Sequence, residues 1–205
     1  MPAYDIRDVI AQAKHNEEET GLLYERLHWK VNHIQRTVPV VAAQATTHLI
    51  DFVHAYIEHV PSMIDALGDA AEASACLRQV APLINLVEDI FIYGSNRSHE
   101  ERDLEELLSQ AYLAHRLVEE INEHFRKDQG LHLARIDMTS ADLIAAHLIG
   151  DLIAPALDEL AKETALSLFH EQGLKMHQID QHWQRNWSHF ASLHELTPPG
   201  LSAAH

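Results

Sequence analysis

Apolar residues recur along the chain every three or four positions, the spacing that gives a helix one buried face. This pattern predicts a first helix over 4–36 and a second over 39–60. Pro61 is expected to end the second helix and to open a shorter third one to about Leu77, because proline suits the first turn of a helix. A fourth helix is predicted over about 80–94. No run of residues alternates apolar and polar side chains as a half-buried strand would.

The helical spacing continues through the second half of the chain. It predicts a fifth helix over 98–128, an irregular loop over 129–138, a sixth helix over 139–165 and a last helix over about 167–195. Pro155 should kink the sixth helix, because proline lacks the backbone N–H of a regular turn. Capping boxes, in which Ser or Thr is followed three residues later by an acid, mark the starts of the fifth and sixth helices at Ser98 with Glu101 and at Thr139 with Asp142.

Helices of this length, joined by short connections, predict an all-α fold: a single-domain antiparallel bundle of six or seven helices. The bundle is expected to span 1–196, followed by a disordered tail over 197–205. The sixth helix is apolar around most of its circumference, so it should lie near the centre of the bundle.

The charge balance narrows the classes of partner. Fifteen Lys and Arg residues oppose 31 Asp and Glu residues, for a net charge of −16 with neutral histidines. A surface this acidic repels phosphate groups, so no nucleic-acid partner and no membrane association are expected. No apolar run is long enough to span a membrane, and Cys76 has no second cysteine for a disulfide. Because the N-terminus also lacks the pattern of a signal peptide, a cytoplasmic protein is expected.

The chain has 17 histidines among its 205 residues, and this residue type most strongly indicates what chemistry to expect. It is the commonest metal ligand in proteins. Six histidines have a carboxylate four residues downstream. This spacing puts both groups on one helix face, one turn apart. This order is not the one that stabilises an exposed helix pair, and two such groups can bind one metal ion. The pairs are His15/Glu19, His54/Glu58, His99/Asp103, His115/Glu119, His124/Asp128 and His147/Asp151.

Two of these pairs are candidates for an interior site. His115 lies on the core face of the fifth helix with Glu119 one turn on, and His147 and Asp151 lie on the narrow polar strip of the sixth. A mixed set of nitrogen and oxygen ligands predicts a non-haem iron or zinc site, and iron with open positions would support redox or dioxygen chemistry. A hydrogen bond from His115 to a neighbouring helix is the alternative. The predicted ligands are His115, Glu119, His147 and Asp151, with His177 or Asp180 from the last helix.

Two other functions fit the sequence. In the first, this is a non-enzymatic interaction or regulatory protein that forms a homo-oligomer, most simply a dimer, through Trp183, Trp187 and Phe190 of the last helix. In the second, the histidines titrate together between about pH 7 and 5 and make the protein pH-responsive. The sequence has no motif for a serine nucleophile, a phosphate loop or a dinucleotide turn, and it identifies no small-molecule substrate.

Overall fold

The computed structural model describes residues 5–34, 42–95, 98, 101–129 and 138–170. These residues form seven helices and no strand, which confirms the all-α fold. None of the described helices combines the length and the apolar character needed to cross a membrane. The helices are α1 (Ile6–Thr20), α2 (Leu22–Ile34), α3 (Ala42–Ala73), α4 (Leu77–Tyr93), α5 (Leu104–Gln129), α6 (Thr139–Ile149) and α7 (Ile153–His170).

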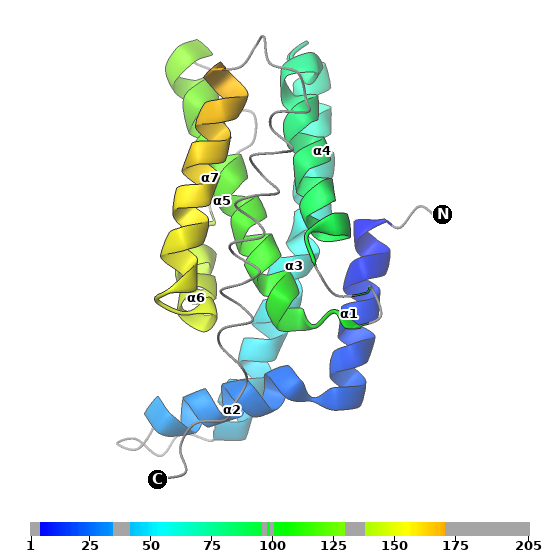
Figure 1. The fold of residues 1–205 in the computed structure, drawn as a ribbon, viewed down its shortest axis with the longest axis vertical. Helices are drawn as coiled ribbons and strands as arrows, with labels where there is room; N and C mark the ends of the chain where they lie inside the picture. Colours follow the sequence, from blue (N-terminus) through cyan, green and yellow to red (C-terminus); the bar gives the residue numbers. More distant parts are fainter. Residues whose placement is uncertain (1–4, 35–41, 96–97, 99–100, 130–137, 171–205) are drawn as a thin grey trace.

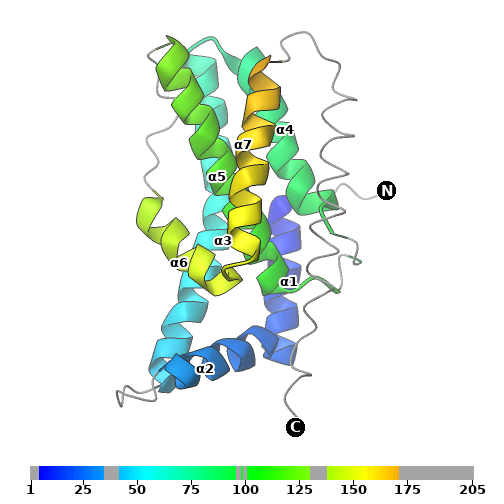
Figure 2. The same ribbon diagram turned by 60° about the vertical axis from the view of Figure 1, so that its left-hand side comes forward.

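The long helices pack side by side, while α2 crosses the lower end of the bundle at a steep angle (Figures 1 and 2). The directions of α3, α4 and α5 alternate, as an antiparallel bundle requires. By contrast, α7 runs in the same direction as α5, because the chain returns to the lower end before α7 begins. The contacts between α5 and α7 are the most extensive in the fold.

The central helix is α5, not the sixth predicted helix. Every residue from 107 to 115 is buried, so neighbours surround this part of α5 on all sides. The expectation of a central helix over 139–165 is wrong. Its apolar side chains include Leu143, which is 65% exposed, and Leu152, which is 83% exposed. The apolar composition of this segment therefore did not predict its place in the bundle.

The predicted helix over 4–36 is broken at Gly21. This glycine has a φ of 63°, in the left-handed region that ends helices. Its N–H donates to the carbonyl of Glu17 at 2.7 Å. The buried Glu17 carboxylate then accepts from the N–H groups of Leu23 and Tyr24, each at 2.9 Å. The carboxylate thereby caps the first turn of α2 and fixes the elbow between the two helices.

Pro61 lies inside α3 and does not end it, so the predicted boundary at this residue is wrong. An interior proline costs a helix about 3 kcal/mol. Buried apolar side chains on both sides of the proline offset that cost, because they dock each half of α3 on the same core. These side chains are Val53, Ile57, Val60, Met63, Ile64 and Leu67.

The fifth helix begins at Leu104 rather than at 98. The cap is Asp103, whose Oδ1 accepts from the N–H of Glu106 at 2.8 Å, so the predicted capping box at Ser98 does not start the helix.

A buried arginine then holds the start of α5 against two other helices. Arg102 is 2% exposed and donates to the carbonyl oxygens of Phe91 and Ile92 at the end of α4. The Arg102 carbonyl in turn accepts from Asn16 of α1 at 2.9 Å. One residue therefore fixes where α1, α4 and α5 meet.

The predicted helix over 139–165 is two helices. Gly150, with a φ of 112°, lies between α6 and α7, and Pro155 falls in the first turn of α7, where proline is tolerated. The capping box predicted at Thr139 is also wrong, since the cap position is Met138 and Asp142 is used elsewhere. Helix α7 continues through 165–167 to His170, and the remainder of the predicted last helix lies outside the described residues.

The Glu17 cap gives a test of the elbow. Substituting Glu17 with Ala should lower the free energy of unfolding by about 1–2 kcal/mol, because the N–H groups of Leu23 and Tyr24 lose a charged acceptor. Glu18 is exposed on the next position of α1, so Glu18→Ala is the matched control and should change little. Urea denaturation of the two variants makes the comparison, and equal midpoints would contradict the role of Glu17.

Candidate functional site at a histidine pair

Two histidines meet in the middle of the bundle. His115 on α5 is 1% exposed, and its Nε2 lies 3.0 Å from Nδ1 of His59 on α3. The two rings are tilted by 30° with centroids 5.2 Å apart. Because the line of α5 that contains His115 faces α3, the fold places these imidazoles together. We call them the histidine pair.

A tyrosine and an aspartate adjoin the histidine pair. The ring of Tyr56, one turn before His59 on α3, lies against the His115 ring with centroids 4.4 Å apart. The Tyr56 hydroxyl donates to Oδ1 of Asp142 on α6 at 2.6 Å. Asp142 is 6% exposed, and its Oδ2 has no hydrogen-bond partner among the described residues. Three helices therefore deliver polar groups to one buried region.

Burial keeps the His115 imidazole neutral. Desolvation first, and then the neighbouring His59, lower the pKa of His115 to about 3, while the Ala111 carbonyl raises it. Nδ1 of His115 is buried and has no hydrogen-bond partner among the described residues. A neutral imidazole can donate through one nitrogen and accept, or bind a metal ion, through the other.

Asp142 is less acidic than an exposed aspartate. Desolvation raises its pKa, and the Tyr56 hydroxyl and the positive charge of Arg116 lower it. The charges of Asp158 and His59 also act on this carboxylate. The same contacts raise the pKa of Tyr56, chiefly by burial, so its hydroxyl stays protonated and remains a donor.

A second polar group lies beside the pair, between α5 and α7. Asp158 accepts from the Tyr112 hydroxyl at 2.9 Å and from Nε of Arg116 at 2.8 Å. The Arg116 guanidinium also pairs with Glu119 and, at 3.7 Å, with Glu120. Burial raises the pKa of Glu119, and Arg116 lowers it. One guanidinium therefore serves three carboxylates, and its bond to Asp158 joins α5 to α7.

The structure separates the predicted ligands. His115 is buried as expected, and Glu119 lies one turn on, held by Arg116. His147 and Asp151 are both exposed. His177 and Asp180 lie outside the described residues, so their part in a site stays a prediction. The alternative for His115, a hydrogen bond to a neighbouring helix, matches its contact with His59.

Sequence reasoning missed three residues of this region. His59 follows Tyr56 by three positions, so the inward face of the predicted second helix could have revealed it. Asp142 was assigned to a capping box, and no local signal marks its bond to a tyrosine far away in the sequence. Across the described ranges, no three His, Cys, Asp or Glu side chains lie close enough together to hold a metal ion as they stand.

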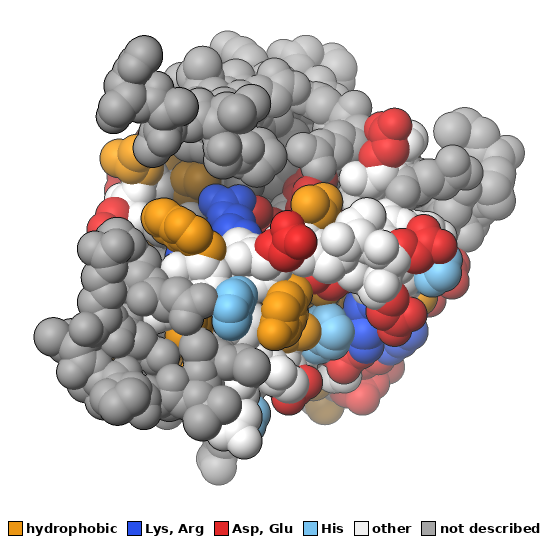
Figure 3. Space-filling view, turned by 90° about the horizontal axis from the view of Figure 1, so that it is seen from below, with side chains coloured by type: hydrophobic (Ala, Val, Ile, Leu, Met, Phe, Trp, Pro, Cys, Tyr) orange, Lys and Arg blue, Asp and Glu red, His pale blue; other side chains and the backbone are white. Residues whose placement is uncertain are grey.

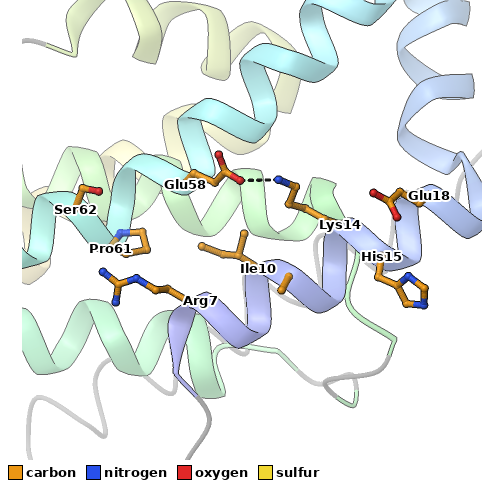
Figure 4. A pocket seen from close by; sticks show the side chains of 9 residues that line it. Arg7, Ile10, Lys14, His15, Glu18, Glu58, Pro61 and Ser62 are labelled. Atoms are coloured by element: carbon orange, nitrogen blue, oxygen red, sulfur yellow. Dashed lines mark hydrogen bonds and ion pairs between the residues drawn. The ribbon is translucent and has the colours of Figure 1, made fainter.

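A groove of about 460 Å³ lies between α1 and α3 (Figure 4). Its two cations are paired across the helices: Lys14 with Glu58 at 2.5 Å and Arg7 with Asp65 at 2.8 Å. These charges neutralise each other and join the helices, so we assign no ligand to the groove.

The lower end of the molecule presents apolar, acidic and histidine side chains intermixed (Figure 3). Leu22 and Trp29 on α2 are 58% and 65% exposed. The predicted dimer stripe of Trp183, Trp187 and Phe190 lies beyond the described part of the chain.

Comparison of the chain with protein-family models, with curated proteins and with solved structures found no match in any of the three. The functional conclusions below therefore come from the geometry of the residues.

The lowered pKa of His115 predicts how stability depends on pH. Between about pH 6.5, the usual pKa of histidine, and pH 3, the unfolded chain binds a proton that the folded chain does not. This residue should therefore make stability fall on acidification by about 1.4 kcal/mol per pH unit over that range.

His115→Gln should remove this contribution, and His15→Gln, at an exposed position of α1, is the control. Denaturant unfolding at several pH values between 4.5 and 6.5 measures the slope for each variant. An unchanged slope in His115→Gln would show that the buried imidazole does not resist protonation.

Proposed function

We propose that this protein binds a divalent transition-metal ion through His59 and His115, in a centre of the zinc or non-haem iron type inside the helical bundle. The observation that supports this most is the 3.0 Å separation of two ring nitrogens that come from different helices. This proposal keeps His115 from the predicted ligand set and replaces the exposed His147 with His59.

The separation of the two nitrogens suits ligands of one ion. With Zn–N bonds of about 2.0–2.1 Å, two nitrogens on one ion lie about 3.3 Å apart in a tetrahedral site and about 2.9 Å apart in an octahedral one. The histidine pair is close to this spacing, but its nitrogens now point at each other in a hydrogen bond. Both rings therefore have to turn until their lone pairs converge on the ion, which takes the place of that hydrogen bond.

The far side of His115 suits a ligand as well. A metal-bound histidine donates its other N–H to a carbonyl or carboxylate, which fixes the ring. If Nε2 binds the ion, the proton of His115 is on Nδ1, and the Ala111 carbonyl, which acts on this ring, is the candidate acceptor. Nδ1, which is buried without a hydrogen-bond partner among the described residues, would then be the donor that fixes the ring.

Two histidines leave coordination positions for oxygen ligands and for solvent. Such mixed ligation fits zinc and also fits iron, which with open positions would carry out redox or dioxygen chemistry. The neutral state of His115 favours the ion, because a neutral imidazole keeps one ring nitrogen unprotonated near neutral pH.

The other two functions, an interaction protein and a pH-responsive protein, remain predictions from the sequence. The low pKa of His115 removes this residue from any shared titration between pH 7 and 5. Titration of the other histidines, assembly as a homo-oligomer and a cytoplasmic location are expectations from the sequence.

The test is zinc binding by the untagged chain, measured by calorimetry and by competition with a coloured chelator. Wild type should bind one equivalent of zinc. His59→Ala and His115→Gln should each reduce the affinity for this equivalent at least about tenfold. His15→Ala removes an exposed histidine that also has a carboxylate one turn on, and it should leave this equivalent unchanged.

Circular dichroism should first confirm that each variant is helical. Retention of the equivalent in folded His59→Ala and His115→Gln would overturn the proposal. Loss in a fourth variant, His147→Ala, would instead favour the ligand set predicted from the sequence.

A further inference from the structure

We infer that α6 is a movable latch over the histidine pair: binding of the ion draws the Asp142 carboxylate away from the Tyr56 hydroxyl and onto the metal, and α6 shifts with it. This inference rests on the proposed function and adds to it a third ligand, a competing hydrogen bond and a conformational response.

Asp142 is the carboxylate placed to complete the centre. It bonds to the tyrosine whose ring lies against His115, and His59 is among the groups that lower its pKa. One oxygen is held by Tyr56 at 2.6 Å, and the other is buried without a hydrogen bond in the described structure. Burying a carboxylate oxygen without a hydrogen-bond donor costs free energy, and binding a cation would recover part of that cost.

The bond to Tyr56 accounts for the lack of a three-ligand cluster in the described residues. While Asp142 is directed at the hydroxyl, the pair provides two ligands only. The ion and the hydroxyl therefore compete for one carboxylate. The other charged groups that act on Asp142 are Arg116 and Asp158, which already bond to each other.

Helix α6 is held loosely enough to follow its aspartate. It has 11 residues, of which Asp142, Ala145 and Ile149 are buried, while Leu143 and Ile144 are 65% and 43% exposed. Its N-cap residue, Met138, makes no side-chain capping hydrogen bond.

The end of α6 offers a hinge. Gly150 follows directly, with a φ of 112° that residues other than glycine rarely adopt. Lys30 of α2 donates to the carbonyl of Leu148 at 2.7 Å, which tethers this end while Asp142 anchors the other. A rotation about Gly150 therefore moves Asp142 and leaves the tethered end in place.

Competition predicts opposite effects for the two partners of one hydrogen bond. Tyr56→Phe frees the carboxylate and should tighten zinc binding about tenfold, because the ion no longer displaces a charged hydrogen bond. Asp142→Asn removes the third ligand and should weaken zinc binding at least about tenfold. If Tyr56 only supported the fold around the pair, its loss would weaken binding or leave it unchanged.

Hydrogen exchange measures the movement directly. Addition of zinc to the wild-type chain should change the exchange rates of the α6 amides, with α4 as the internal reference. In Asp142→Asn the same addition should leave α6 unchanged, even at zinc concentrations that fill the histidine pair.

The outcomes separate the two proposals. If His59→Ala and His115→Gln bind zinc like wild type, the proposed function fails. If those variants lose zinc but Tyr56→Phe does not bind it more tightly, or the α6 amides exchange at the same rate with and without zinc, the latch is wrong and the metal centre stands.

Discussion

The complete burial of the middle of α5 is the constraint on which the other features depend. A helix surrounded on all sides has little solvent for its polar side chains, so their hydrogen bonds have to come from the protein itself. Gln110 is an exception, because neither polar atom of its buried side chain has a hydrogen-bond partner among the described residues. Ser109 bonds to the carbonyl of Glu105 within α5, and His115 finds His59 on α3. Arg102 does the same at the start of α5, where it bonds to the end of α4. These partnerships set the register of the bundle, which apolar contacts alone leave open.

The two polar groups beside α5 differ in how their carboxylates are bonded. Between α5 and α7, Arg116 forms direct ion pairs with Asp158 and Glu119, and these pairs join the two helices. Between α3 and α6, Asp142 accepts from the Tyr56 hydroxyl, its second oxygen has no hydrogen-bond partner among the described residues, and Arg116 acts on it through charge alone. This difference is the physical reason to seek chemistry at the histidine pair and stability at Arg116.

Helical spacing was enough to predict the fold class, the core face of α5 and the burial of His115. It could not predict the elbow at Gly21, because the apolar pattern runs smoothly through it and the break depends on Glu17 reaching the amide of Leu23. Periodicity likewise places Asp142 on a helix but cannot show that a tyrosine from another helix takes its oxygen. Sequence spacing predicts the faces of one helix at a time, whereas the histidine pair depends on how α3 and α5 pack against each other.

The anchors of α6 lie far from it along the chain. Asp142 bonds to a residue 86 positions away, and the tether to Leu148 comes from Lys30, 118 positions away. At 11 residues, α6 is also shorter than the roughly 12–15 residues that an isolated helix needs to be marginally stable in water. Contacts this remote in sequence cost more loop-closure entropy than local ones, so they form later than the contacts within each helix. Helix α6 should therefore be among the last elements to fold and the first to open, well before the core around α5 is lost.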